Sequence, residues 1–337
     1  MKALLLLALL FLGGCSTEAD VGSDYIKRLE NILDVQATLA AQPLPEFPST
    51  RLLTVNEVKQ VISVREFLSL RECKLHTVLA HRNSLIGKFS QPSQALFSDL
   101  DILATGPACL EKIDDKALAK KLADFLSDKK TRIAGTLARA ILGEAENRSF
   151  WSVSATSDNY PGRLQQETIP SIRALSSFAE SILAGNYTFS AQEYRQIERH
   201  LGQLRFGDGG LLLSRYLMLG NNLEHGSALI KKRLERPLCL NSEPTQKAVY
   251  FQNVVNKLFI QQLQRQAVLY SQRKDHLLPS YLQLEALLIA YMPITYRQWA
   301  HSRDEIFARG ELASKLHAQT IQTLFKQCGL TAGKPMR

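Results

Sequence analysis

The chain has 337 residues, of which 45% are hydrophobic and 22% are charged, and its formal net charge is +9. This balance is typical of a globular protein and excludes a chain that is disordered throughout. The length is near the upper limit for one hydrophobic core, so we expect one large domain or two smaller ones. The positive charge alone allows a nucleic acid, an anionic membrane or an acidic polymer as a partner.

The first fifteen residues have the proportions of an export signal. Lys2 precedes an apolar run from Ala3 to Leu12, which is too short for a membrane-spanning helix of roughly 20 residues. The run ends in Leu12-Gly13-Gly14-Cys15, which resembles the bacterial lipobox. The resemblance implies a signal peptide over residues 1–14, cleavage before Cys15, lipidation of the Cys15 thiol, and acylation of the new amino group with a fatty acid such as palmitate.

The residues after Cys15 bear on localisation. Ser16 stands where an Asp would resemble the inner-membrane retention signal, so we expect the default route to the outer membrane, with the protein facing the periplasm. Residues 15–24 form a polar tether, and no later apolar run approaches membrane-spanning length. The lipid on Cys15 is therefore the expected membrane attachment, and nucleic acid is excluded as a partner.

Basic residues are spread along the chain, with short clusters at Lys129-Lys130 and Lys231-Lys232-Arg233. Both clusters fall at expected helix ends, where cations complement the helix dipole. We therefore favour solvated helix faces. The alternative is a functional basic patch, for which anionic lipid, lipopolysaccharide or peptidoglycan are the candidate partners in the envelope.

The expected elements of the N-terminal half are helices broken by prolines. A helix over residues 25–42 ends at the prolines of segment 43–48. A capping box at Thr54–Glu57 opens a long helix that stops at the Gln91-Pro92-Ser93 turn. A shorter helix over residues 94–104 ends at Gly106-Pro107, and another spans residues 115–147.

The C-terminal half continues with helices. After a Ser/Thr/Asn/Pro-rich connector at 149–164, we expect helices over residues 165–183, 211–236 and 281–291 and in the segment 245–273. Capping boxes at Ser190–Glu193 and Ser302–Glu305 open two more helices, the last of which reaches Cys328. The chain thus reads as all-α, an antiparallel multi-helix bundle with helical halves at 25–148 and 165–328 and a tail at 329–337, and no convincing strand is found.

Four cysteines remain after Cys15, and export to an oxidising compartment favours two disulfides with three possible connectivities. Cys73 lies eighteen residues before Gln91, and Cys109 lies eighteen residues after it. An antiparallel hairpin folded at that turn brings these two cysteines level. We therefore prefer Cys73–Cys109, which leaves Cys239–Cys328.

Motifs that would carry catalysis are missing from the sequence. There is no His-Glu-x-x-His zinc motif and no Gly-x-Ser-x-Gly nucleophile elbow. Glu180-Ser181 resembles the catalytic pair of helical lytic transglycosylases, but the rest of that pattern does not follow it. A zinc site at Cys73, His76 and Cys109 needs reduced thiols, which the compartment disfavours. We therefore assign no catalytic residue, metal ligand or cofactor.

Arg82-Asn83-Ser84 is a polar group within an otherwise apolar helical pattern. The hairpin folded at Gln91 places Arg82 within reach of Asp99 and Asp101. Two interpretations stay open. Arg82 either forms a partly buried ion pair that fixes helix register, or the three residues contact a ligand or partner near the hairpin tip.

Several features together resemble one family of Gram-negative bacterial lipoproteins, which is known only by a domain-of-unknown-function label. They are the lipobox, Tyr25…Arg28-Leu29, Pro43-Leu-Pro45…Pro48…Arg51, and Cys73…Arg82-Asn83-Ser84…Gly87…Ser93…Cys109. The resemblance implies export and supplies no activity. We therefore expect a non-catalytic binding or scaffold protein of the cell envelope. The alternative is an enzyme acting on an envelope polymer, such as a peptidoglycan-cleaving glycosidase, without a recognisable motif.

Overall fold

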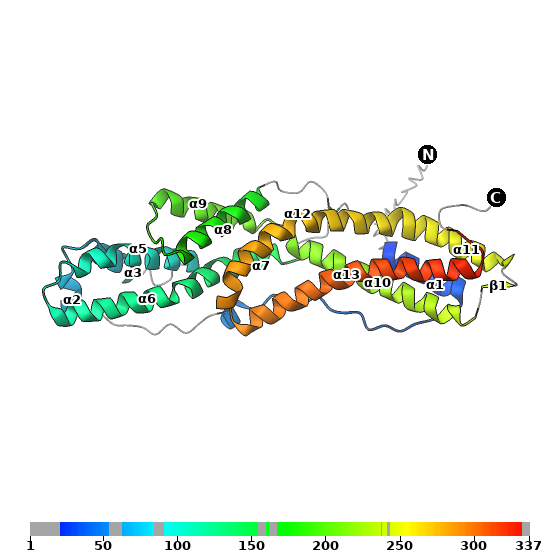
Figure 1. Cartoon of the computed structure of the whole chain (residues 1–337), viewed down its shortest axis with the longest axis horizontal. Coiled ribbons are helices and arrows are strands. Elements are labelled where there is room, and N and C mark those ends of the chain that lie inside the picture. The colour runs from blue at the N-terminus through cyan, green and yellow to red at the C-terminus, as the bar shows by residue number, and fades with distance from the viewer. Residues whose placement is uncertain are drawn as a thin grey trace, which may run out of the picture. The chain divides into compact units, whose positions relative to one another are not determined.

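A computed structural model of the chain describes residues 21–53, 63–83, 91–153, 160–161, 167–236, 238–240 and 243–331. These residues are almost entirely helical (Figure 1), and the all-α prediction is confirmed. The elements are α1 (Val21–Leu33), η1 (Thr50–Leu53), α2 (Val64–Ser69), α3 (Lys74–Asn83), α5 (Pro92–Leu110), α6 (Lys116–Leu142), α7 (Ala145–Phe150), α8 (Thr168–Leu183), α9 (Ala191–Leu204), α10 (Gly209–Leu234), β1 (Cys239–Leu240), β2 (Glu243–Pro244), α11 (Gln246–Val254), the π-helical η2 (Val255–Leu263), α12 (Gln264–Leu288), η3 (Ile289–Tyr291) and α13 (Ile294–Gln327).

The contacts divide the chain into two compact units, each assembled from separate segments. Unit 1 comprises Met1–Ala40, Asn221–Gln266 and Ala313–Arg337, and unit 2 comprises Ala41–Gly220 and Ala267–Leu312. These units do not coincide with the expected halves 25–148 and 165–328. The reason is that α10, α12 and α13 each continue from one unit into the other, so the chain passes between the units several times.

The first helix of unit 1 is shorter than expected. α1 buries Tyr25, Ile26, Leu29 and Leu33 at helical spacing, and it packs against α11 and η2. It ends at Leu33 rather than near residue 42, because Asp34 has a left-handed backbone with φ of 50° that stops the helix.

The first disulfide, which lies in unit 2, has the predicted pairing. The Cα atoms of Cys73 and Cys109 are 5.4 Å apart, and the bond joins the segment before α3 to the end of α5. Buried apolar side chains surround it, namely Leu70, Leu75, Leu79, Ile102, Leu118, Leu122 and Leu126. The disulfide is therefore part of the core where α3, α5 and α6 meet.

The long helix expected before Gln91 is interrupted. α2 ends at Ser69, and α3 begins only at Lys74, so a continuous helix is wrong. The capping box expected at Thr54–Glu57 lies outside the described residues. Within them, Ser63 caps α2, accepting a bond from the Glu66 amide at 3.3 Å and donating its own amide to the Glu66 carboxylate at 2.7 Å.

Packing overrides two helix-stop signals. α5 does not end at residue 104 but runs through Pro107 to Leu110, because Pro107 is exposed while Gly106 and Cys109 are buried. The close approach requires a glycine, since a Cβ on Gly106 would lie 2.4 Å from a methyl carbon of Leu126. The expected break between residues 273 and 281 is also wrong, since α12 spans it and continues through Pro279.

One expected capping box is confirmed and another is wrong. Ser190 caps α9, with both reciprocal bonds to Glu193 present. The motif at Ser302–Glu305 does not open a helix, because α13 already begins at Ile294 and the motif lies inside it. Arg303, within this motif, is completely buried, so the segment is fixed by packing and not by a helix start.

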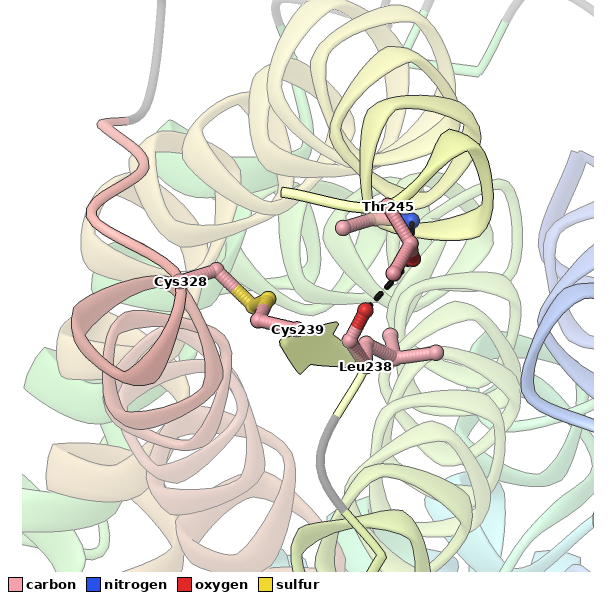
Figure 2. The surroundings of a disulfide bond; sticks show 5 residues. Leu238, Cys239, Thr245 and Cys328 are labelled. Carbon is pink, nitrogen blue, oxygen red and sulfur yellow. Dashed lines mark hydrogen bonds between the residues drawn. A yellow bond between two sulfur atoms is a disulfide. The ribbon is translucent and has the colours of Figure 1, made fainter. Parts of the chain in front are cut away.

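The second disulfide also has the predicted pairing. Cys239 and Cys328 have Cα atoms 5.4 Å apart, and the bond ties the end of α13 to the connection between α10 and α11 (Figure 2). That connection contains a two-residue antiparallel strand pair, β1–β2, which the sequence did not predict. The Thr245 hydroxyl donates to the Leu238 carbonyl beside it. Closing a loop of 89 residues stabilises the fold by roughly 4 to 5 kcal/mol on the chain-entropy account.

Across the described ranges, none of the helices combines the length and the apolar character needed to cross a membrane.

Candidate functional site

The predicted site residues Arg82 and Asn83 form the end of α3, whereas Cys15 and Ser84 lie outside the described residues. Arg82 is partly buried and makes an ion pair with Asp99 of α5, so the predicted approach of these two side chains is confirmed. Asn83 is exposed. Of the two aspartates that the hairpin geometry placed within reach of Arg82, the ion pair is with Asp99.

Asp99 has a second cationic partner that the sequence did not reveal. Its side chain is only 3% exposed, and Lys129 of α6 donates to its two oxygens at 2.9 and 3.0 Å. The helix-end interpretation of Lys129 is wrong, because Lys129 lies in the middle of α6 and its ammonium group binds Asp99. A signal was present in the apolar spacing around Lys129, since Leu122, Leu126 and Ile133 are buried on the same helix.

Asp101 points to a different neighbour. It accepts a hydrogen bond from the hydroxyl of Tyr194 on α9 at 2.9 Å, and the Tyr194 ring stacks on Phe97 at 4.3 Å. Burial raises the pKa of the Asp101 carboxyl above its usual value. The two aspartates of α5 therefore hold different helices, with Asp99 joining α3 and α6 and Asp101 joining α9.

The arrangement around Asp99 predicts a non-additive response to mutation. Arg82→Ala should lower the free energy of unfolding by only about 1–2 kcal/mol, because Lys129 still neutralises the carboxylate. Combining Arg82→Ala with Lys129→Met should cost about 1–2 kcal/mol more than the sum of the single changes, because Asp99 is then buried without a cation. Urea unfolding of the four proteins measures this coupling, and additive losses would contradict it.

Among the described residues of unit 2, Arg303 on α13 is the charged residue with the least exposed side chain. Its guanidinium donates to both Glu285 oxygens, at 2.8 and 2.6 Å, and the Arg303 side chain is 0% exposed. The guanidinium carbon also lies 4.9 Å from the ring centroid of Trp151 and 5.3 Å from that of Trp299. Tyr296 donates to Glu285 at 2.7 Å. An ion pair enclosed by aromatic rings in this way is a core element, because every charged atom already has a partner.

A second carboxylate of unit 2 is held in a similar way. Asp208, in the turn before α10, accepts bonds from Arg273 of α12 at 2.9 and 2.5 Å and from the hydroxyl of Tyr160 at 2.8 Å. The turn needs glycine, since a Cβ on Gly207 or Gly209 would lie 2.2 or 2.3 Å from Phe150. The Gly207–Gly210 segment is therefore a helix-connecting turn that is anchored by an ion pair.

Unit 1 contains one fully buried histidine, His317 of α13. The Tyr25 hydroxyl lies 2.8 Å from its Nε2, and the Ser227 hydroxyl lies 2.9 Å from its Nδ1. Ser227 donates its own proton to the Leu223 carbonyl at 2.7 Å. The hydroxyl oxygen therefore accepts from Nδ1–H, and Nε2 accepts from Tyr25. Burial lowers the pKa of the His317 imidazole to about 3, so the ring is neutral near pH 7.

Two candidates for chemistry from the sequence find no support in this geometry. Glu180 lies exposed on α8, whereas the acid of a glycosidase needs apolar surroundings that keep it protonated. Cys73 and Cys109 are joined in a disulfide, so neither sulfur is free to bind zinc with His76. Among the described residues, no group of three or more His, Cys, Asp or Glu side chains is placed to hold a metal ion.

These features define a class of protein, an all-α fold with two disulfides in which the buried charges described above are paired with one another. The chain belongs to the family described as "Protein of unknown function (DUF3080)", whose family model matches residues 23–332. This confirms the predicted relationship to a family known only by such a label. Comparison with curated proteins and with solved structures gave no match.

Proposed function

We propose that the protein is a lipoprotein of the outer membrane that faces the periplasm and acts there as a non-catalytic binding or scaffold protein. The observation that carries the proposal is the Leu12-Gly13-Gly14-Cys15 sequence behind a short apolar run. The two disulfides support it, because disulfides persist in oxidising compartments such as the periplasm.

The non-catalytic role is supported by the pairing of three carboxylates with cationic side chains inside the fold. Asp99, Asp208 and Glu285 each accept hydrogen bonds from cationic side chains within the fold. A catalytic acid or base must instead keep a position free for substrate. The proposed partner is another envelope protein or an anionic cell-wall polymer, which crosslinking in intact cells followed by mass spectrometry would identify.

The anchoring part of the proposal predicts a clear loss. Wild-type protein should incorporate a palmitate analogue and fractionate with the outer membrane, whereas Cys15→Ser should incorporate none and leave that fraction. Without acyl chains the variant loses the membrane affinity that comes from burying their methylenes in the bilayer, each of which contributes about 0.8 kcal/mol. Unlabelled wild-type protein would refute the lipoprotein proposal.

The choice of membrane is tested separately by Ser16→Asp. This variant should still be labelled but should shift to the inner membrane, while the uncharged isostere Ser16→Asn serves as the control. Equal fractionation of wild type and Ser16→Asp would remove the argument for the outer membrane and leave lipidation untouched.

A further inference from the structure

The basic excess of the protein is concentrated in unit 1. Among the described residues, unit 1 carries eleven Lys and Arg against six Asp and Glu, whereas unit 2 carries 24 against 22. Unit 2 is therefore almost neutral for its size. The charge that the whole sequence shows belongs mainly to the smaller unit, which also contains α1, the first described helix after the predicted lipid-bearing cysteine.

Part of this excess gathers at one end of unit 1. Lys231, Lys232 and Arg236 are exposed in and just after the last turn of α10. The disulfide between Cys239 and Cys328 brings the end of α13, and with it the exposed Lys326, to the same end. We call these four side chains the basic end.

The basic end keeps a net positive charge within the described structure, although the exposed Glu235 lies next to Arg236. Lys231, Arg236 and Lys326 make no ion pair there, and Lys232 donates only to the Gln36 carbonyl at 3.0 Å. The neighbouring Asp34 carboxylate is already paired with Lys247, which holds the pKa of the Asp34 carboxyl below its usual value. Helix-end cations of this kind are often only solvated, so location relative to the membrane decides what they can contact.

That location follows from the length of chain before α1. Six residues, from Cys15 to Asp20, precede Val21 and span at most roughly 20 Å. α1 has thirteen residues and is itself roughly 20 Å long. Its far end is next to the basic end, since Lys232 contacts Gln36 and Lys247 contacts Asp34. A lipid on Cys15 can therefore reach a bilayer against which the basic end lies.

We propose that the basic end of unit 1 docks on the anionic phospholipid headgroups of the membrane that holds the lipid anchor. This inference rests on the proposed lipidation and adds an orientation to it, with unit 1 against the membrane surface. Each Lys or Arg near an anionic surface favours binding by about fivefold, so the four cations together attract the unit to such a surface even without the anchor, which adds to the effect by confining the unit there. The exposed Tyr250, one turn after Lys247 on α11, is a suitable side chain for the interface.

The test uses the mature chain carrying Cys15→Ser, so that no acyl group contributes. Binding is measured by co-sedimentation with phosphatidylcholine vesicles, with and without phosphatidylglycerol, at salt concentrations of roughly 0.05 M and 0.5 M. We expect binding only to the phosphatidylglycerol vesicles, and only at low salt. The variant Lys231→Gln/Lys232→Gln/Arg236→Gln/Lys326→Gln should bind at least about tenfold more weakly.

A matched control removes the same charge from unit 2. Arg71, Lys74, Lys112 and Lys130 are exposed and make no ion pair in the described structure, and their change to Gln should leave binding unaltered. Melting curves show whether both variants fold. Equal losses in the two variants, or no dependence on phosphatidylglycerol, would overturn the proposal. The proposal would also be overturned if the protein binds isolated peptidoglycan through the basic end but binds no vesicles. Because the chain is unacylated, these results are independent of whether Cys15 is labelled in cells.

Discussion

Arg303→Met is expected to lower the free energy of unfolding by about 3–5 kcal/mol, because it leaves the Glu285 carboxylate buried without its cation. The Glu285 side chain is 5% exposed and would retain only the hydrogen bond from Tyr296. Removing the facing charge as well, in Arg303→Met/Glu285→Gln, should recover part of the loss. Urea unfolding gives the free energy of unfolding of wild type, Arg303→Met and the double variant.

The same experiment has an internal control and a second readout. Arg28→Met removes an exposed pair with Asp24 on α1, and it should cost less than about 1 kcal/mol because water screens that pair. Trp151 and Trp299 both lie over the Arg303 guanidinium, so tryptophan fluorescence should report the change directly. A loss in Arg303→Met no larger than in Arg28→Met would show that the buried pair does not support the core.

Local patterns predicted the elements where the local signal and the packing agree. The Ser190 capping box opens α9 because Ile197, Leu201 and Leu204 bury the face that follows it. The equal distance of Cys73 and Cys109 from Gln91 predicted their disulfide correctly, although the helix before the turn is interrupted. The pairing requires only that the two antiparallel segments bring the cysteines side by side, and it does not require a continuous helix.

The failures occurred where tertiary contacts decide. Pro107 signalled a helix end, yet burial on the opposite face of α5 carries the helix past it. The Ser302–Glu305 pattern signalled a helix start, but Arg303 instead binds Glu285 and its aromatic neighbours. Glu285 and Arg303 flank the connection between α12 and α13, but taking Ser302 as a helix start concealed this relation, and no spacing relates Trp151 to either residue.

The candidate site shows the same division. Arg82 and Asp99 were found because one turn relates them, whereas Lys129 comes from a third helix whose register against α5 the sequence does not state. His317 was missed for a similar reason, since its partners Tyr25 and Ser227 are 292 and 90 residues away. Sequence reasoning thus predicted a contact between two segments joined by one turn, but it did not predict contacts that involve a third helix.

His317 should make the stability of the protein depend on pH. Its pKa is about 3 in the folded chain and near 6.5 when unfolded, so folding favours the neutral ring. The contribution is therefore fully present above pH 6.5 and is lost progressively as the pH falls from 6.5 towards 3. The groups that face the ring in the described structure are the hydroxyls of Tyr25 and Ser227 and the ring of Phe259, none of which supplies a negative charge in that range. The loss should reach roughly 3 to 5 kcal/mol near pH 3.

The measurement compares urea unfolding at pH 7 and pH 4 for wild type, His317→Gln and His301→Gln. Gln keeps a donor and an acceptor for Ser227 and Tyr25 but cannot take up a proton, so His317→Gln should lose less stability on acidification than wild type does. His301 is 75% exposed, and His301→Gln should follow the wild-type curve. Carboxyls whose pKa burial raises, such as Asp101, are present in all three proteins, so the difference between wild type and His317→Gln isolates the buried imidazole. If those two proteins lose the same stability between pH 7 and pH 4, His317 is not the group whose protonation opposes the fold.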